Sequence, residues 1–186
     1  MKSKFVLAQL EQKGLPEENL ENAKKAVAEA MELYKPDLMV FPECFMSHFP
    51  MGTDRATCLG TAQTLDGPFV TGMKALAKDN GIWIIFGMNE KVEDPSDDRN
   101  YNCTVVINSD GEIVSTYHKT HLYDAFGYKE SDDNKPGDHF LSRSILRSEK
   151  LVSSSATKSV SRKLRVISVP RELILSSCRQ HGYRDR

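Results

Sequence analysis

Short apolar runs that alternate with amphipathic segments constrain this chain more than any other feature of its sequence. Runs that fit strands occur at residues 5–10, 38–41, 82–88, 100–108 and 113–117. Residues 16–34 and 68–79 carry apolar side chains at helical spacing, so each predicts a helix. Proline, here Pro16, is typical of the first turn of a helix, and glycine, here Gly81, is typical of the residue just after its last turn. Residues 109–112 predict a hairpin turn. This order predicts an α/β domain in which helices cover a sheet.

The sequence changes character after about Asp138. Residues 141–165 contain eight serines interleaved with Arg and Lys, and they show neither strand nor helix periodicity. Such a composition has little apolar surface to offset the entropy lost on folding. We therefore expect residues 1–138 to fold and residues 139–186 to form a disordered tail.

Length and charge limit the partners of this chain. Its 186 residues suffice for one domain with a core. Lys and Arg total 25 against 26 Asp and Glu, so no basic excess favours nucleic acid or an anionic membrane. No run approaches the roughly 20 apolar residues of a membrane-spanning helix, and the N-terminus lacks a signal-peptide cleavage site. We expect a cytoplasmic protein that binds neither nucleic acid nor membrane.

Three polar residues near predicted strand ends are candidates for catalysis. Glu43 follows the apolar run that ends at Phe41, and α/β sheets place their sites at the carboxyl ends of strands. A partly desolvated carboxylate there suits proton transfer, although a helix cap or a solvated loop acid is an equally open interpretation. Lys119 follows another strand, where it is either an oxyanion-stabilising group or an ordinary surface lysine. Glu130 could orient Lys119 or tune the carboxylate of Glu43; the other interpretation is a capping or solvated residue.

No metal or organic cofactor is expected. His118 and His121 flank Lys119, but no third ligand lies nearby in the sequence, so a metal site is not predicted. The cysteines show neither paired metal spacing nor a disulfide framework; they are Cys44, Cys58, Cys103 and Cys178.

Several segments together resemble the nitrilase superfamily of carbon–nitrogen hydrolases, in order, from residue 4 to 138. The matching segments are VFPECF at 40–45, LDGPF at 65–69, GIWIIFG at 81–87, YHKTHLYDAFGYKESD at 117–132 and KPGD at 135–138. The segment around Lys119 is the most specific match, and the FPE segment supports it. The resemblance implies an αββα sandwich, of which this chain contains the first half only.

The resemblance also implies a Glu-Lys-Cys triad without metal or organic cofactor. On that basis Glu43 matches the general base, Lys119 the oxyanion-stabilising lysine and Glu130 a second glutamate of the site. In such a triad a thiolate attacks the carbon, an acyl-enzyme forms, and water releases it. The match looks more like the small-molecule amidases of the family, so the expected substrate is a small linear amide. Family members commonly pair through sandwich faces, which leaves a homo-oligomer open.

The expected nucleophile is absent from the sequence. The family places its cysteine in a segment like G-K-I-G-x-x-x-C-Y-E-x-R-F-P-E, and no such segment is present. Cys44 is better read as a small buried residue, and Cys178 lies in the tail. The tail can be translated in a shifted frame, in which each codon takes the third base of one residue's codon and the first two bases of the next. In that frame the codon across Ser148 and Glu149 can encode Gly, and the codon across Ser155 and Ala156 can encode Cys, followed by Tyr and Glu. We therefore predict a reading-frame shift near Asp138.

Two alternatives to a working amidase remain. The first is an inactive remnant without a function of its own. The second is a nucleotide-binding α/β module, which the missing Gly-rich loop between strand and helix disfavours.

Overall fold

Six strands form one sheet in the computed structural model, which describes residues 2–50, 52–138 and 163–170. The sheet order is β5-β4-β3-β2-β1-β8. Its strands are β1 (Lys2–Gln9), β2 (Leu38–Val40), β3 (Trp83–Lys91), β4 (Asn100–Ile107), β5 (Ile113–His118) and β8 (Lys163–Pro170). The helices are α1 (Pro16–Leu33), α2 (Arg55–Gly60) and α3 (Pro68–Asn80), with a short 3-10 turn η1 (Glu130–Asp132). A separate hairpin pairs β6 (Asp124–Ala125) with β7 (Tyr128–Lys129).

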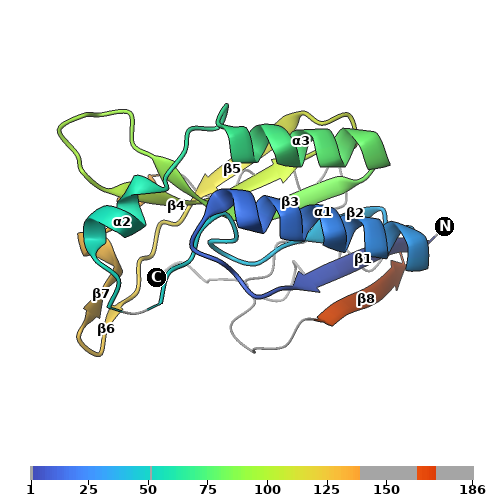
Figure 1. Ribbon diagram of the computed structural model, residues 1–186, viewed down its shortest axis with the longest axis horizontal. Helices are drawn as coiled ribbons and strands as arrows, with labels where there is room; N and C mark the ends of the chain where they lie inside the picture. The colour runs from blue at the N-terminus through green and yellow to red at the C-terminus, as the bar shows by residue number, and fades with distance from the viewer. Residues whose placement is uncertain (1, 51, 139–162, 171–186) are drawn as a thin grey trace, which may run out of the picture.

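The sheet is parallel on one side of β3 and antiparallel on the other. β1, β2 and β3 are parallel because helical crossovers connect them, whereas β3, β4 and β5 follow one another as antiparallel neighbours. Helices α1 and α3 lie side by side over the same face of the sheet (Figure 1). The described residues thus form one helical layer on one sheet, and the predicted α/β fold, as half of an αββα sandwich, is confirmed.

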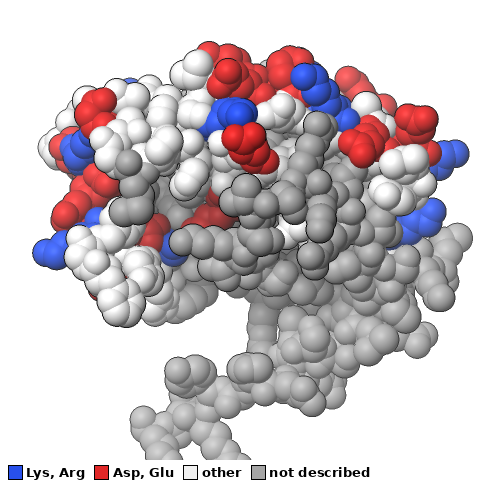
Figure 2. Space-filling model, turned by 60° about the horizontal axis from the view of Figure 1, so that its bottom comes forward, with Lys and Arg blue, Asp and Glu red and all other residues white. Residues whose placement is uncertain are grey.

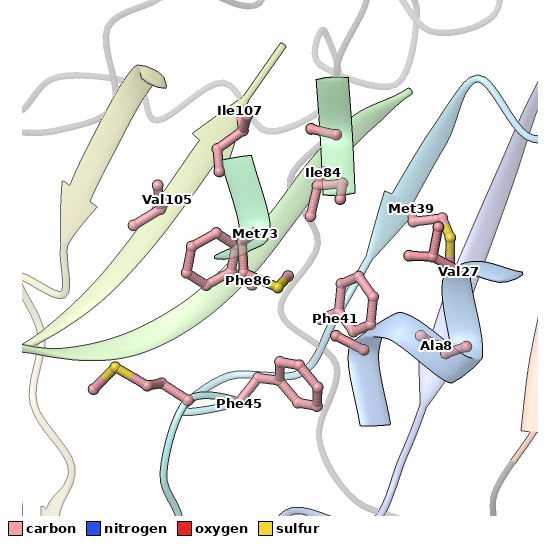
Figure 3. Close-up of a cluster of buried hydrophobic side chains, with 14 of the residues drawn as sticks. Ala8, Val27, Met39, Phe41, Phe45, Met73, Ile84, Phe86, Val105 and Ile107 are labelled. Carbon is pink, nitrogen blue, oxygen red and sulfur yellow. The ribbon is translucent and has the colours of Figure 1, made fainter. Parts of the chain in front are cut away.

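The main core fills the space between these two helices and the sheet. Helix α1 begins at Pro16, and it presents small side chains, among them Ala23, Ala26 and Ala30, that allow close packing. Helix α3 ends at Gly81, whose φ of 61° is the left-handed conformation that favours glycine. Figure 3 shows side chains that meet the helices: Phe41, just after β2, and from the sheet Ala8, Met39, Ile84, Phe86, Val105 and Ile107. Full burial of a Val, Ile, Phe or Met side chain contributes roughly 1.5–3 kcal/mol.

Strand β8 corrects part of the tail prediction. Residues 163–170 pair with β1 in an antiparallel ladder that runs from Lys2–Pro170 to Gln9–Lys163. The sequence KLRVISVP is rich in β-branched residues, which favour strands. Without β8, β1 would be an edge with unpaired backbone groups, and the added strand satisfies them. The prediction of a tail without regular structure is therefore wrong for these residues.

The rest of the predicted tail, residues 139–162 and 171–186, lies outside the described residues, so the boundary near Asp138 stays a prediction. In the part of the chain that the structure does describe, no helix is both long enough and apolar enough to cross a membrane. On the face shown in Figure 2, acidic and basic side chains lie interspersed, without one continuous basic patch among the coloured residues.

Candidate active site

Glu43, Lys119 and Glu130 lie together at one end of the sheet. Glu43 follows β2 by three residues, Lys119 directly follows β5, and Glu130 begins η1. The Lys119 Nζ atom donates to Glu43 Oε1 at 3.1 Å and to Glu130 Oε2 at 2.9 Å. The structure therefore brings the three candidate residues together. Their catalytic roles remain a prediction.

Asn102 completes this cluster, and the sequence did not identify it as a site residue. Its Nδ2 atom donates to Glu43 Oε1 at 2.8 Å and to Glu130 Oε1 at 3.1 Å. Its backbone oxygen accepts from the Lys119 N–H at 2.9 Å. The sequence gives little signal for it, because β4 also contains the polar residues Asn100 and Thr104; in the structure Asn102 is buried, at 6% exposure. The carboxylates of Glu43 and Glu130 therefore each accept hydrogen bonds from both Lys119 and Asn102.

The charges of the cluster stabilise one another. Burial disfavours the charged form of Glu130, but the Tyr123 N–H, Lys119 and Asn102 outweigh it and lower the pKa of this carboxyl. Burial likewise opposes the charge on Lys119, but hydrogen bonds to Glu130 and Glu43 raise its pKa above the usual value. The side chain of Glu130 is 7% exposed, whereas that of Glu43 is 50% exposed. Glu130 is thus a buried partner of Lys119, whereas Glu43 is open to solvent.

The contribution of Glu130 to stability should depend on pH. Because its pKa is lowered on folding, its stabilisation is present above the ordinary value of 4.5 and is lost as the pH falls through the lowered pKa. Because the pKa of Lys119 is raised, its stabilisation is lost only at alkaline pH, above its ordinary value of 10.5. We expect Glu130→Gln to reduce the free energy of unfolding near neutral pH, and the difference from wild type to shrink below pH 4.5. Urea titrations at both pH values measure this.

The matched control for that experiment is Glu32→Gln, on the exposed surface at the end of α1. It should differ little from wild type at either pH. A constant difference between Glu130→Gln and wild type across the acid range would contradict the assigned charge on Glu130.

Glu43 is held by a tight turn against β3. The Gly87 N–H donates to the Pro42 oxygen at 3.1 Å, and the Gly87 oxygen accepts from the Met46 N–H at 3.1 Å. A Cβ atom on Gly87 would lie 2.8 Å from the Glu43 Cα atom and 2.4 Å from the Cys44 nitrogen. Gln12 also donates to the Glu43 backbone oxygen. Cys44 adopts a φ of 52°, which is uncommon for a residue other than glycine. The turn that carries Glu43 therefore requires glycine at position 87 of β3.

Cys44 is beside the cluster but is unsuited to act as its nucleophile. Burial, Glu43 and Glu130 raise the pKa of the Cys44 thiol to about 12. A thiol whose pKa is raised in this way stays protonated near neutral pH, and the thiolate is the reactive form. Cys58 lies on α2, and Cys103 is buried within β4. None of the cysteines in the described residues presents a thiolate to Lys119.

Alkylation tests this conclusion. We expect iodoacetamide to label Cys44 of the native chain far more slowly than Cys44 of the urea-unfolded chain, because only the latter has an ordinary thiol pKa. Mass spectrometry of the peptide that contains Cys44 gives both rates. Equal rates in the two states would contradict the raised pKa.

The two histidines that flank Lys119 have partners outside the cluster. His118 Nε2 lies 2.8 Å from Glu90 Oε2, and His121 Nδ1 lies 2.9 Å from Thr120 Oγ1. The cluster itself offers one cation between two carboxylates, so it can exchange a proton through the exposed Glu43 and stabilise a developing oxyanion through Lys119.

Comparison with known proteins identifies the family of this chain. The carbon–nitrogen hydrolase family model matches residues 6–164. The deaminated glutathione amidase of Dictyostelium discoideum is 35% identical over 121 residues, which cover 63% of this chain and 41% of that protein. Nitrilase homolog 2 of the same organism is 33% identical over 129 residues, covering 67% of this chain and 38% of that protein.

A solved structure has the same fold. The carbon–nitrogen hydrolase of Helicobacter pylori G27 superposes with a TM-score of 0.63 at 23% identity, over 74% of this chain and 46% of that one. The chain spans about two fifths of the length of the two curated relatives. The family match covers most of the sequence, and this chain belongs to the carbon–nitrogen hydrolases of the nitrilase superfamily.

Proposed function

We propose that this chain is the first part of an amidase that hydrolyses the non-peptide C–N bond of a small linear amide. The observation that carries the proposal is the Lys119 ammonium between the carboxylates of Glu43 and Glu130. The amidase among the relatives supports an amide rather than a nitrile as substrate.

Each residue of the cluster has a proposed role. Glu43, half exposed, acts as the general base that takes the proton of a cysteine thiol and later that of the hydrolytic water. Lys119 stabilises the oxyanion that forms when the thiolate attacks the amide carbonyl. Glu130 is a positioning residue, because its buried carboxylate holds the ammonium of Lys119 in place. Together these groups would serve formation and hydrolysis of an acyl-enzyme.

The nucleophile is the missing part of this proposal. No cysteine of the chain stands in a segment like the one that carries the family's nucleophile, and the raised pKa of Cys44 keeps it a thiol. We propose that a frame shift near Asp138 accounts for this, so the chain as given forms no acyl-enzyme. An inactive remnant is therefore the second candidate function for the 186-residue chain itself.

A gene repaired near codon 138 tests the proposed function. The repaired protein should hydrolyse small linear amides and release ammonia, and it should prefer amides to the matching nitriles. The 186-residue chain should release none under the same conditions. A repaired protein that turns over nitriles but no amides would exclude the amidase assignment, and turnover by the 186-residue chain that Cys178→Ala abolishes would refute the frame shift.

A nucleotide-binding module is less well supported. The loop between β1 and α1, where a phosphate-binding loop would lie, contains one glycine, Gly14. The space a side chain would occupy at Gly14 is filled by the ring of Phe49, which lies 2.4 Å from the expected Cβ position. A phosphate therefore has no room to approach the backbone there.

A further inference from the structure

A second group of chemically active side chains lies on the opposite face of the sheet from the Glu43 cluster. Cys103 follows Asn102 on β4, and His118 precedes Lys119 at the end of β5, so each points away from the candidate active site. Cys103 and His118 are directly opposite each other in the β4–β5 ladder. Glu90 reaches them from β3, where it is opposite Tyr101. We propose that Glu90, Cys103 and His118 bind a zinc-type divalent cation.

The three ligand atoms are close enough for one ion. The Glu90 carboxylate oxygen, the Cys103 Sγ atom and the His118 imidazole nitrogen all lie within 4.8 Å of one another. Around zinc, ligand atoms at about 2.0–2.3 Å from the ion stand roughly 3.3–3.7 Å apart. His118 Nε2 and Glu90 Oε2, now 2.8 Å apart, would separate slightly, and the sulfur would approach. Side-chain movements of about 1 Å are enough to bring the three ligand atoms to the spacing that zinc requires.

The scaffold holds these ligands in place. Each comes from a strand of the same sheet, which positions side chains more rigidly than a loop. The His118 ring is stacked on Tyr101, with ring centroids 4.0 Å apart and an interplanar angle of 7°, so its orientation is fixed before an ion arrives.

The ligand chemistry and charge favour zinc over magnesium or calcium. Imidazole and thiolate are zinc ligands, whereas magnesium and calcium take oxygen ligands. A thiolate and a carboxylate supply two negative charges, which neutralise a divalent ion in a largely buried site. The Cys103 thiol would release one proton to solvent as its sulfur binds the metal. Glu90 and His118 side chains are 15% and 28% exposed, so an ion has a route in from solvent, and a water can take the fourth position.

Metal binding by the 186-residue chain tests the proposal without any measurement of hydrolysis. The probes are Zn²⁺, in competition with a chromophoric chelator, and Co²⁺, whose bond to a thiolate gives a charge-transfer band in the near ultraviolet. We expect one equivalent of metal per chain and the cobalt–thiolate band. Cys103→Ser should abolish the band, and Glu90→Gln and His118→Phe should each weaken Zn²⁺ binding by at least about tenfold. Phe at position 118 keeps a ring to stack on Tyr101.

The matched controls are Cys58→Ser and His121→Gln, which remove a cysteine on α2 and a histidine bonded to Thr120, both outside the cluster, and they should leave binding unchanged. Circular dichroism shows whether Cys103→Ser folds. If it does not fold, the Zn²⁺ affinities of Glu90→Gln and His118→Phe test the proposal, because these two side chains are partly exposed and their replacement should leave the fold intact. The proposal is overturned if the wild-type chain binds no Zn²⁺ in the competition. It is also overturned if the three cluster variants bind as wild type does, or if Cys58→Ser loses the cobalt band.

Discussion

Replacing Lys119 with alanine in the frame-repaired enzyme should lower kcat by about 10²–10³-fold or more. Loss of one oxyanion-stabilising donor alone typically costs this much. The variant also leaves the carboxylates of Glu43 and Glu130 without the cation between them, since both accept from Lys119 Nζ. Glu43→Gln should lower kcat as severely, because an amide cannot take the proton of the nucleophile.

Initial rates on a panel of small amides measure both effects, with circular dichroism to show that the variants fold. Lys25→Ala, on the exposed surface of α1, is the matched control and should keep the wild-type rate. If Lys119→Ala or Glu43→Gln retained activity within about tenfold of wild type, the assigned roles would be wrong.

The second large effect is expected at Gly87, where β3 passes the turn that carries Glu43. A methyl group there would lie 2.4 Å from the Cys44 nitrogen and 2.8 Å from the Glu43 Cα atom, and both of these are backbone atoms. They cannot move aside as the end of a flexible side chain can. Overpacking of this kind costs roughly 1–3 kcal/mol, and we expect Gly87→Ala to lie at the upper end. It should also displace Glu43 from Lys119.

Urea unfolding of the 186-residue chain measures the loss, and the rate of the repaired enzyme reports the displacement. Gly60→Ala is the matched control, because nothing lies within 4 Å of the corresponding Cβ position and Gly60 does not have a positive φ. A Gly87→Ala variant within about 0.5 kcal/mol of wild type would show that the turn can shift at little cost.

The sequence alone determined the elements whose signals are local. Pro16 and Gly81 mark helix ends through their own backbone preferences, and α1 and α3 follow from apolar spacing that a single helix imposes. The placement of Glu43 and Lys119 after strands could be predicted for the same reason, because strand ends are visible in the pattern of apolar residues. Helix α2 was missed because it has no buried face; an Asp54 cap bonded to the Thr57 N–H begins it.

Only the tertiary structure decided which residues meet. Asn102 joins the site because the β4–β5 register sets its backbone oxygen opposite the Lys119 N–H, and register depends on two strands at once. Glu130 reaches Lys119 because the β6–β7 hairpin folds the chain back. The carboxylate of Glu130 also accepts a hydrogen bond from the Tyr123 N–H. Strand β8 pairs with β1, although most of the sequence lies between the two strands. In each case the deciding interaction joins segments that are apart in the chain, so no local pattern records it.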